Sequence, residues 1–311
     1  MSAKKKKTAS RKSRELLVSF ICFLVMLAIS GTALLLDRFG IVNLGIFEKP
    51  RETYAVSGGT MEIHMIDIGQ GDSILIMTPD GNILVDTGEN STESEDKLKS
   101  YLDDLGITEF KYVIFTHPDA DHIGGGDMIV NTYSIDTVLM EPYNYDSETK
   151  VYKDLNSAIT TKSVTVIDPS PKELYTVGDL RLTILSPTKD YGDKNENSIV
   201  ARIDFGETSV MLTGDAEKKA EKDILATYST SELDCDVLKV GHHGSSTSST
   251  QAFIDAVTPQ YAIISVGEGN KYNHPNEDTL KRLEDAGATI LRTDQLGSIV
   301  LESDGKNFTK K

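Results

Sequence analysis

The chain has 311 residues, of which 39% are apolar and 26% charged; this composition is typical of a globular protein and excludes a disordered or collagen-like chain. The net charge of −16 is uneven, because residues 1–55 carry 10 basic and 4 acidic side chains and residues 56–311 carry the remaining 22 and 44. The acidic part repels polyphosphates at long range, which excludes non-specific coating of nucleic acid but not metal-mediated phosphate chemistry.

The N-terminus combines a basic segment with an apolar run. Residues 4–14 hold seven positive charges, and residues 16–36 form 21 consecutive positions without a charge, enough to cross a bilayer as one helix. Because basic flanks stay in the cytoplasm, we expect a single-pass signal-anchor in the cell membrane, with the rest of the chain outside. Cleavage near Ser30 is the alternative and would yield a secreted protein.

These boundaries predict the domain organisation. Residues 1–15 are expected to be a cytoplasmic tail, residues 37–58 a linker and residues 59–311 one extracytoplasmic domain. The two cysteines, Cys22 and Cys235, provide no disulfide framework, so this domain must be stable from its apolar core alone.

Within this domain, short β-branched runs alternate with helical patterns and strong turn signals. The expected strands are residues 61–66, 73–77, 83–86, 112–115, 137–140, 164–167, 180–185, 199–205, 209–213, 237–240, 262–266, 289–291 and 298–301. The expected helices are residues 93–105, a segment from Gly125, and residues 216–228, 251–257 and 276–286. This α/β pattern suggests two sheets packed face to face, with helices on both outer faces.

The densest group of candidate metal ligands follows the strand at residues 112–115. His117, Asp119, Asp121 and His122 lie within six residues of one another. Alternation directs the first three toward one side, while His122 can reach a second centre. Imidazole combined with carboxylate suits zinc, manganese or iron better than calcium, which prefers oxygen ligands.

Later strand ends supply the ligands that a two-metal site still requires. Asp215 follows one strand, where its carboxylate can bridge two cations. His242 and His243 follow the strand at residues 237–240, and His274 lies in a later Gly-rich loop. A bridging carboxylate with a terminal histidine for each cation would hold two metal ions close together.

The order His117-x-Asp119-x-Asp121-His122, then Asp215, then a late histidine resembles the metallo-β-lactamase superfamily. Within it, three segments resemble the C-terminal extracellular domain of ComEC-type DNA-uptake proteins: residues 65–73, 84–88 and 241–245. The resemblance covers about residues 60–305 and implies a four-layer αββα metallo-β-lactamase sandwich with two metals at the shared edge of its sheets. With one expected span in place of a multi-helix channel, the chain is not expected to conduct DNA itself.

The resemblance also implies a division of the ligands. One metal is assigned to His117, Asp119, Asp215 and His243, and the other to Asp121, His122, Asp215 and His274. His242 then becomes a proton donor or phosphate contact, although the roles of the two adjacent histidines can be exchanged. For His274 the alternative is a loop-capping role. The superfamily usually has histidine in place of Asp119, and a further histidine where Asn195-Glu196-Asn197-Ser198 stands here.

Several other polar residues are expected around the metal site. Asp86 resembles the superfamily aspartate that orients the metal loop by hydrogen bonds. Asp67 is assigned a similar role, as Asp72 could be, with turn capping as the alternative for both. Ser245 either contacts a phosphate or caps the helix that follows.

Two sets of side chains bear on substrate contact. Lys239 and Lys271 are the nearest cations to the site and could meet an anionic substrate, with a solvated surface role as the favoured alternative for Lys271. The aromatic insert at residues 141–152, with Tyr143, Tyr145 and Tyr152, could stack bases or pack on the core.

The expected function is metal-dependent hydrolysis by a hydroxide that two zinc or manganese ions activate, with Asp121 managing the proton and His242 protonating the leaving group. The resemblance implies a phosphodiester substrate, foremost DNA at the cell surface. One alternative keeps the site but hydrolyses a small phosphodiester, an envelope component or a lactone. Another is a non-catalytic, membrane-tethered binding protein with structural metals. No protein partner is expected.

Overall fold

The computed structural model describes residues 58–143 and 148–311, so the predicted tail, the predicted span at residues 16–36 and nearly all of the predicted linker lie outside it. Within the described ranges, no helix has the length and apolar character needed to cross a membrane. The described residues of Glu52–Tyr228 and Glu232–Lys311 form one compact unit. The fold below is that of this unit.

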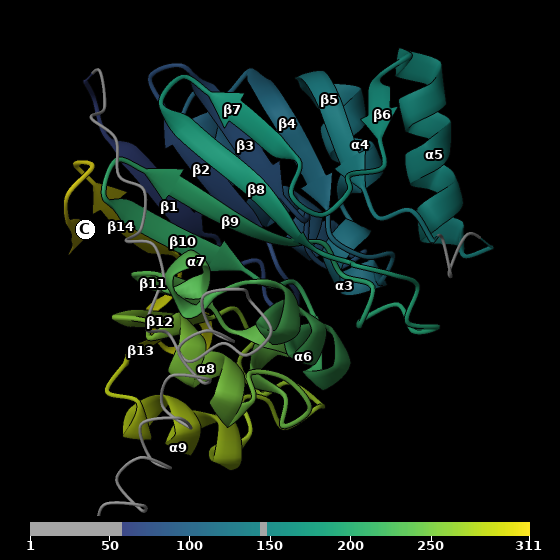
Figure 1. Cartoon of the computed structure of the whole chain (residues 1–311). Coiled ribbons are helices and arrows are strands. Elements are labelled where there is room, and N and C mark those ends of the chain that lie inside the picture. The colour runs from purple at the N-terminus through teal and green to yellow at the C-terminus, as the bar shows by residue number, and fades with distance from the viewer. Residues whose placement is uncertain (1–57, 144–147) are drawn as a thin grey trace, which may run out of the picture. The chain divides into compact units, whose positions relative to one another are not determined.

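The first sheet has eight strands in the order β15-β14-β1-β2-β3-β4-β5-β6 (Figure 1). Neighbouring strands are parallel from β3 to β6 and antiparallel elsewhere in this sheet. The strands are β1 (Met61–Met65), β2 (Ile74–Thr78), β3 (Gly81–Val85), β4 (Glu109–Phe115), β5 (Ser134–Met140), β6 (Thr165–Ile167), β14 (Ile299–Ser303) and β15 (Phe308–Lys310).

The second sheet has seven strands in the order β13-β12-β11-β10-β9-β8-β7. Its strands are parallel from β10 to β13 and antiparallel from β7 to β10. They are β7 (Leu174–Val177), β8 (Leu180–Ser186), β9 (Val200–Phe205), β10 (Thr208–Leu212), β11 (Val237–Lys239), β12 (Tyr261–Ile264) and β13 (Thr289–Arg292).

The two sheets pack face to face because their strands are apolar on both sides, as expected for sheets that helices cover. In β10, Val210 and Leu212 belong to the core between the sheets, and Met211 points to the opposite face, where it packs with helix residues. The inner core also holds Ile203 and Phe205 of β9. The alternation within single strands therefore produces three apolar layers.

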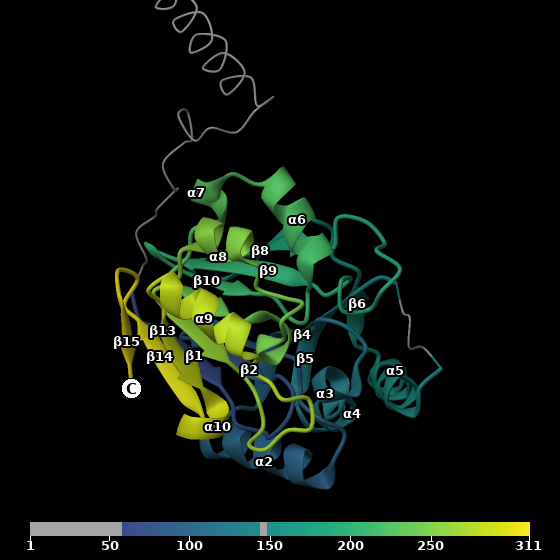
Figure 2. The ribbon, with the colours of Figure 1, turned by 90° about the horizontal axis from the view of Figure 1, so that it is seen from below.

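Helices cover both outer faces (Figures 1 and 2). Leu98 and Ile129 belong to the apolar cluster on the outer side of the first sheet, and Ile224, Phe253 and Leu283 to the one on the second. The first side carries α2 (Thr92–Asp104), α3 (Ala120–Ile123), α4 (Gly126–Thr132) and α5 (Lys150–Lys162); the second carries α6 (Lys218–Thr227), α8 (Gln251–Val257) and α9 (Glu277–Asp285). Two further short helices are α7 (Thr230–Leu233) and α10 (Thr293–Leu296). The expected four-layer αββα sandwich is confirmed.

Helix α5 is the main element that the sequence analysis did not anticipate. Its residue Tyr152 is buried beside Leu155 and Ile159 in the outer cluster of the first sheet, so this tyrosine packs on the core and does not form part of an exposed insert. Tyr145 lies outside the described residues, and Tyr143 is half-buried. The short strands β7 and β15 were also not expected.

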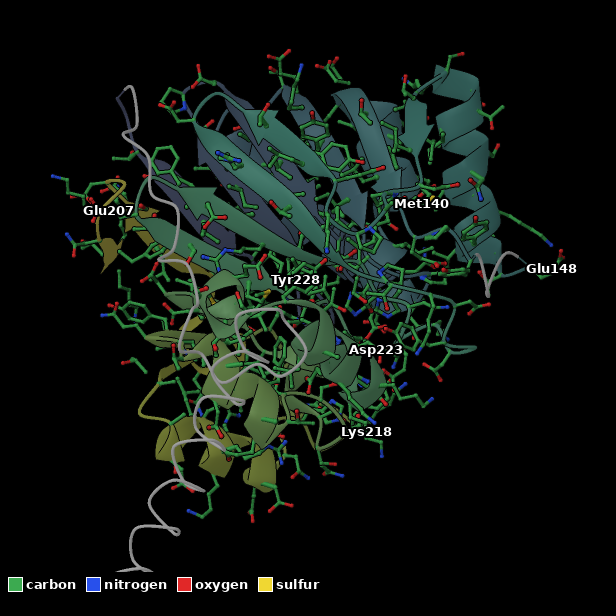
Figure 3. The ribbon with its side chains drawn as sticks, viewed as in Figure 1. Met140, Glu148, Glu207, Lys218, Asp223 and Tyr228 are labelled. Atoms are coloured by element: carbon green, nitrogen blue, oxygen red, sulfur yellow. The ribbon has the colours of Figure 1, made fainter. Side chains whose placement is uncertain are left out.

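The surface of the unit carries charged side chains that stabilise it little. Glu207 and Lys218 are exposed and project away from the ribbon (Figure 3). Lys281 pairs with Asp285 one helical turn along α9, at 2.8 Å, with both side chains largely exposed. Exposed pairs of this kind contribute about 0.2–1 kcal/mol at most, so stability depends on the apolar layers.

Truncation of the inner core should destabilise the unit far more than the same truncation at its edge. Ile203→Ala removes a fully buried side chain between the sheets, and we expect the free energy of unfolding in urea to fall by about 2–5 kcal/mol. The matched variant Ile167→Ala truncates an isoleucine of β6 that is 36% exposed, and its effect should stay below about 1 kcal/mol. Equal losses in the two variants would contradict this layering.

Candidate metal centre

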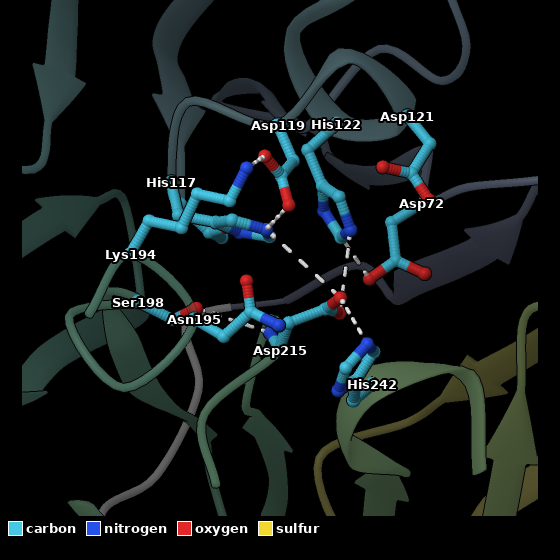
Figure 4. Close-up of polar contacts among 12 residues, drawn as sticks. Asp72, His117, Asp119, Asp121, His122, Lys194, Asn195, Ser198, Asp215 and His242 are labelled. Carbon is cyan, nitrogen blue, oxygen red and sulfur yellow. Dashed lines mark hydrogen bonds and ion pairs between the residues drawn. The ribbon is translucent and has the colours of Figure 1, made fainter. Parts of the chain in front are cut away.

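The candidate ligands converge because parallel strands release the chain at one edge. In open α/β sheets, functional loops gather beyond the carboxyl ends of the strands. Asp86 follows β3 and His117 follows β4, which are parallel neighbours in the first sheet. Asp215 and His243 follow β10 and β11, parallel neighbours in the second. The four loops therefore meet at the shared edge of the sandwich (Figure 4).

One group of polar atoms surrounds the ring of His117. Its Nε2 lies 3.7 Å from Oδ2 of Asp119 and 3.9 Å from Oδ2 of Asp215. The ammonium group of Lys194 forms an ion pair with the other oxygen of Asp119. Figure 4 shows Asp119 between the Lys194 and His117 side chains. This group contains three of the four ligands expected for the first metal.

A second group forms around the rings of His122 and His243. Nε2 of His122 lies 3.3 Å from Oδ1 of Asp215 and 3.3 Å from Nε2 of His243. The Nε2 atom of His243 lies 3.5 Å from Oδ2 of Asp121 and 3.6 Å from Oδ2 of Asp215. Asp215 contacts His117, His122 and His243, so its carboxylate belongs to both groups; its bridging of two metals stays a prediction.

The residues of both groups fit divalent cations. Ligand atoms around one tetrahedral zinc ion lie roughly 3.3–3.6 Å apart, because each bond is about 2.0–2.2 Å long. Nε2 of His117 and Oδ1 of Asp215 are buried and have no hydrogen-bond partner among the described residues. Two of the sets that could hold an ion are His117 with His122 and Asp215, and Asp121 with His122 and His243. The donor set is imidazole and carboxylate, which suits zinc or manganese.

Hydrogen bonds fix the ring of His122 through Asp86. Oδ2 of Asp86 lies 2.8 Å from Nδ1 of His122 and accepts the Thr116 hydroxyl at 2.7 Å, while its Oδ1 accepts the Thr116 backbone N–H at 2.8 Å. Asp86 has a left-handed backbone, with φ of 58°, a conformation that aspartate and asparagine adopt more readily than most residues. Its position matches the orienting role expected for it, with Nε2 of His122 left facing Asp215.

Asp72 and Lys239 lie beneath the candidate ligands, and both are almost inaccessible to solvent. The Lys239 ammonium forms an ion pair with Asp72 and donates to the carbonyl oxygen of Gly214 at 3.1 Å. Burial alone would raise the pKa of Asp72, but Lys239 and His243 lower it to about 2. Lys239 is thus an internal counter-charge and, contrary to expectation, does not reach an anionic substrate.

The loop between β1 and β2 packs directly against the metal-binding loop. The backbone N–H of Asp72 donates to the carbonyl oxygen of Asp121 at 3.1 Å. Gly71 precedes it with φ of 106°, and a Cβ at this position would lie only 2.0 Å from the same carbonyl oxygen. The two loops can approach this closely only because residue 71 has no side chain.

Two consecutive histidines form a strained turn at the end of β11. His242 and His243 have φ of 50° and 53°, within the 3₁₀ turn Gly241–Gly244. The two rings therefore point in different directions. Left-handed residues other than glycine cluster at functional sites. His243 is buried, with Nδ1 donating to the carbonyl oxygen of Ser265 at 2.9 Å. The side chain of His242 is 23% exposed, with Nε2 3.6 Å from Asp215 and Nδ1 3.1 Å from Glu217.

Several expectations for individual residues need correction. His243 lies nearest Asp121 and His122, and no contact between described residues joins it to His117; its Nε2 lies 3.6 Å from Oδ2 of Asp215, the oxygen that His117 also faces. His274 belongs to none of the candidate metal sets; its ring lies 5.5 Å from that of His242. The sequence analysis did not identify Glu217 as part of the site, because only its contact with His242 in the structure indicates this role.

Two expected orienting residues cap turns. Oδ1 of Asp67 accepts the N–H of Gly69 at 3.1 Å, and the Ser245 hydroxyl lies 2.9 Å from that of Thr247 and accepts its N–H. The Asp67 contact matches its turn-capping alternative. Ser245 caps a turn and not the helix that follows, α8, whose N-cap is Thr250.

Comparison with known proteins agrees with this geometry. Residues 66–268 match the profile described as "Metallo-beta-lactamase superfamily", a range that includes every candidate ligand except His274. This chain belongs to the metallo-β-lactamase superfamily. It has the fold and the candidate metal-binding residues of a metal-dependent hydrolase of that superfamily.

Three curated relatives are competence proteins of the ComEC type. The chain is 35% identical over 255 residues to "ComE operon protein 3" of Bacillus subtilis, covering 76% of this chain and 32% of that protein. It is 28% identical over 285 residues to "Competence protein ComA" of Neisseria gonorrhoeae (91% and 38%). It is 30% identical over 248 residues to "Recombination protein 2" of Haemophilus influenzae (78% and 29%). The chain therefore spans about a third of the length of these relatives.

Removing the charge of Asp86 should weaken metal binding without removing a ligand. Asparagine has nearly the same shape as aspartate and also tolerates the left-handed backbone. Its amide has only one acceptor oxygen, so it cannot replace both carboxylate oxygens as acceptors for Thr116 and His122. We expect zinc affinity, measured by competition with a chromophoric chelator, to fall about 10- to 100-fold. Asp136→Asn, at an exposed aspartate paired with Lys111, is the matched control. Unchanged affinity in Asp86→Asn would contradict the orienting role.

Loss of the buried ammonium should destabilise the unit even without metal. Lys239→Met leaves Asp72 buried without its cation, and we expect the free energy of unfolding in urea with EDTA to fall by about 3–5 kcal/mol. Lys281→Met removes an exposed lysine and should cost less than about 1 kcal/mol. Similar losses in the two variants would show that Lys239 is not the counter-charge of this edge.

Proposed function

We propose that this chain is a phosphodiesterase that cleaves DNA with two zinc or manganese ions. The observation that carries the proposal is a pair of overlapping imidazole–carboxylate sets, His117–His122–Asp215 and Asp121–His122–His243. Nε2 of His117 and Oδ1 of Asp215 are buried there without a hydrogen-bond partner among the described residues. The competence-protein relatives support DNA over other phosphodiesters, since two of their names refer to competence and recombination. The same donor set also serves small phosphodiesters, envelope components and lactones, which the experiment below separates.

The metals, when bound, would supply an acidified water and neutralise negative charge that develops on the phosphate. The remaining steps belong to side chains of this chain. Asp121 reaches the second group with its side chain 25% exposed, so it can accept a proton and pass it to solvent. Asp86 and Ser265 hold the rings of His122 and His243 in fixed orientations.

His242 is placed to protonate the leaving group. Its ring is more exposed than those of His117, His122 and His243, and its Nε2 faces Asp215 at 3.6 Å. The Glu217 carboxylate lies 3.1 Å from Nδ1 and orients the ring. Oγ1 of Thr247 donates to the same carboxylate oxygen at 2.6 Å and keeps it in place.

We also propose that the site works outside the cell. The apolar run at residues 16–36 would anchor the chain with its N-terminus in the cytoplasm. Residues 56–311 carry 22 basic and 44 acidic side chains, so bound cations would be needed for DNA to approach the site.

DNA cleavage should depend on both the metals and Asp121. The purified full chain, loaded with zinc or manganese, is expected to cleave end-labelled single- or double-stranded DNA on a sequencing gel. EDTA should abolish cleavage, and Asp121→Ala should reduce its rate by about 10²- to 10⁴-fold. Asp136→Ala, at an exposed aspartate outside the cluster, controls for loss of surface charge.

Circular dichroism and metal content accompany these assays. A folded chain that holds about two metals but does not cleave DNA would overturn the nuclease proposal. Small phosphodiesters and lactones would then be tested with the same variants. A folded variant Asp121→Ala with full activity would remove Asp121 from the mechanism.

A further inference from the structure

A series of aromatic rings leads from the candidate metal centre to solvent. The ring centroids of His243 and His242 lie 6.2 Å apart, those of His242 and His274 5.5 Å, and those of His274 and Tyr272 5.8 Å. The last two rings are nearly parallel, with an interplanar angle of 24°. Exposure rises along the series, from the buried His243 to Tyr272, which is 49% exposed. Tyr272, the outermost ring of the series, is therefore the one that is widely open to solvent.

The loop that carries Tyr272 is held in shape by one side chain. The Asn270 amide group donates to the carbonyl oxygens of Gly267 and His274, at 3.1 and 2.6 Å. Its oxygen accepts the backbone N–H groups of Tyr272 and His274, both at 3.1 Å. Four hydrogen bonds therefore fix the loop around Tyr272, so its ring is presented without being packed into the core.

A cation lies at the outer end of the series. Nζ of Lys271 is 5.0 Å from the centroid of the Tyr272 ring. No carboxylate within residues 58–143 and 148–311 pairs with this ammonium group, whereas many other lysines of the surface are in ion pairs. An exposed ring, a parallel ring behind it and an unpaired ammonium are the components of a site for a flat, anionic ligand.

We propose that Tyr272, supported by His274, is a stacking platform for a nucleobase of single-stranded DNA whose neighbouring phosphate lies at the metal centre. The proposal rests on the proposed function and names the form of its substrate. Bases in a duplex are stacked on each other, so only an unpaired base can place its face on a protein ring. Lys271 then pairs with a phosphate of the same strand. Stacking is independent of net charge and suits a domain in which acidic side chains outnumber basic ones.

The platform should contribute measurable affinity. Base–aromatic stacking is worth about 1–3 kcal/mol per base, which corresponds to a roughly 5- to 150-fold change in Kd. The probes are an eight-nucleotide oligothymidylate with phosphorothioate linkages, which slows cleavage, and an abasic chain of the same length and charge. Both carry a fluorescein, and binding to the zinc-loaded full chain is followed by fluorescence anisotropy.

The chain is expected to bind the oligothymidylate at least 5-fold more tightly than the abasic chain. Tyr272→Ala should remove this preference, and Tyr272→Phe should retain it, because phenylalanine keeps the ring face. Leu174→Ala is the matched control, since Leu174 of β7 is 46% exposed and apolar. Thermal unfolding of each variant establishes that it is folded.

Either of two results would overturn the platform: equal binding of the two probes by the unaltered chain, or an unchanged preference in Tyr272→Ala. Cleavage of an unmodified oligothymidylate is measured separately. A base preference that depends on Tyr272 supports the platform even where no cleavage occurs, and the nuclease proposal alone then fails. Cleavage combined with an unchanged preference removes the platform and leaves the nuclease proposal intact.

Discussion

The edge of this sandwich depends on how buried carboxylates are compensated. Asp72, Asp86 and Asp215 are each at most 3% exposed, and ionised groups in such surroundings must be paired. Lys239 is the one lysine among the buried residues of the described ranges, and it lies between Asp72 and Asp215. The remaining negative charge has to be neutralised by cations that bind reversibly. Although burial would lower the pKa of His243, Asp215, Asp121 and Asp72 raise it to about 10, so protons fill this role when metals do not.

This compensation links the fold to the proposed chemistry. Metal ligands must lose their protons before they bind a cation, so metal loading would exchange protons on the rings of His122 and His243 for divalent charge. The scaffold makes the exchange possible because it is stable from its own apolar layers. Its two half-parallel sheets bring four loops to one edge, and hydrogen bonds to Asp86 and Ser265 hold the rings. The apolar layers thus supply most of the stability, whereas the edge between the sheets supplies the chemistry.

Most of this arrangement could be predicted from residue types at strand ends. His117, Asp121 and Asp215 each follow an apolar run, and parallel strands bring such positions together. The partners of the late histidines could not be predicted in this way. His242 and His243 diverge because both adopt left-handed backbone angles, which nothing in the residues themselves specifies.

Other features were missed for different reasons. Nothing in the sequence distinguishes Lys239 from other lysines at the end of an apolar strand. Its burial depends on its ion pair with Asp72, in the loop between β1 and β2. Helix α5 did leave a signal, the spacing of Tyr152, Leu155 and Ile159, but the tyrosines of the preceding segment suggested an insert instead.

The close approach of Gly71 to Asp121 is equally invisible in the sequence, and it affects how mutational scans of this family would be interpreted. A position with no ligand atom and no charge can be as intolerant as a metal ligand, since any added carbon there would displace the metal-binding loop. Intolerance to substitution at this edge therefore reports shape as often as chemistry.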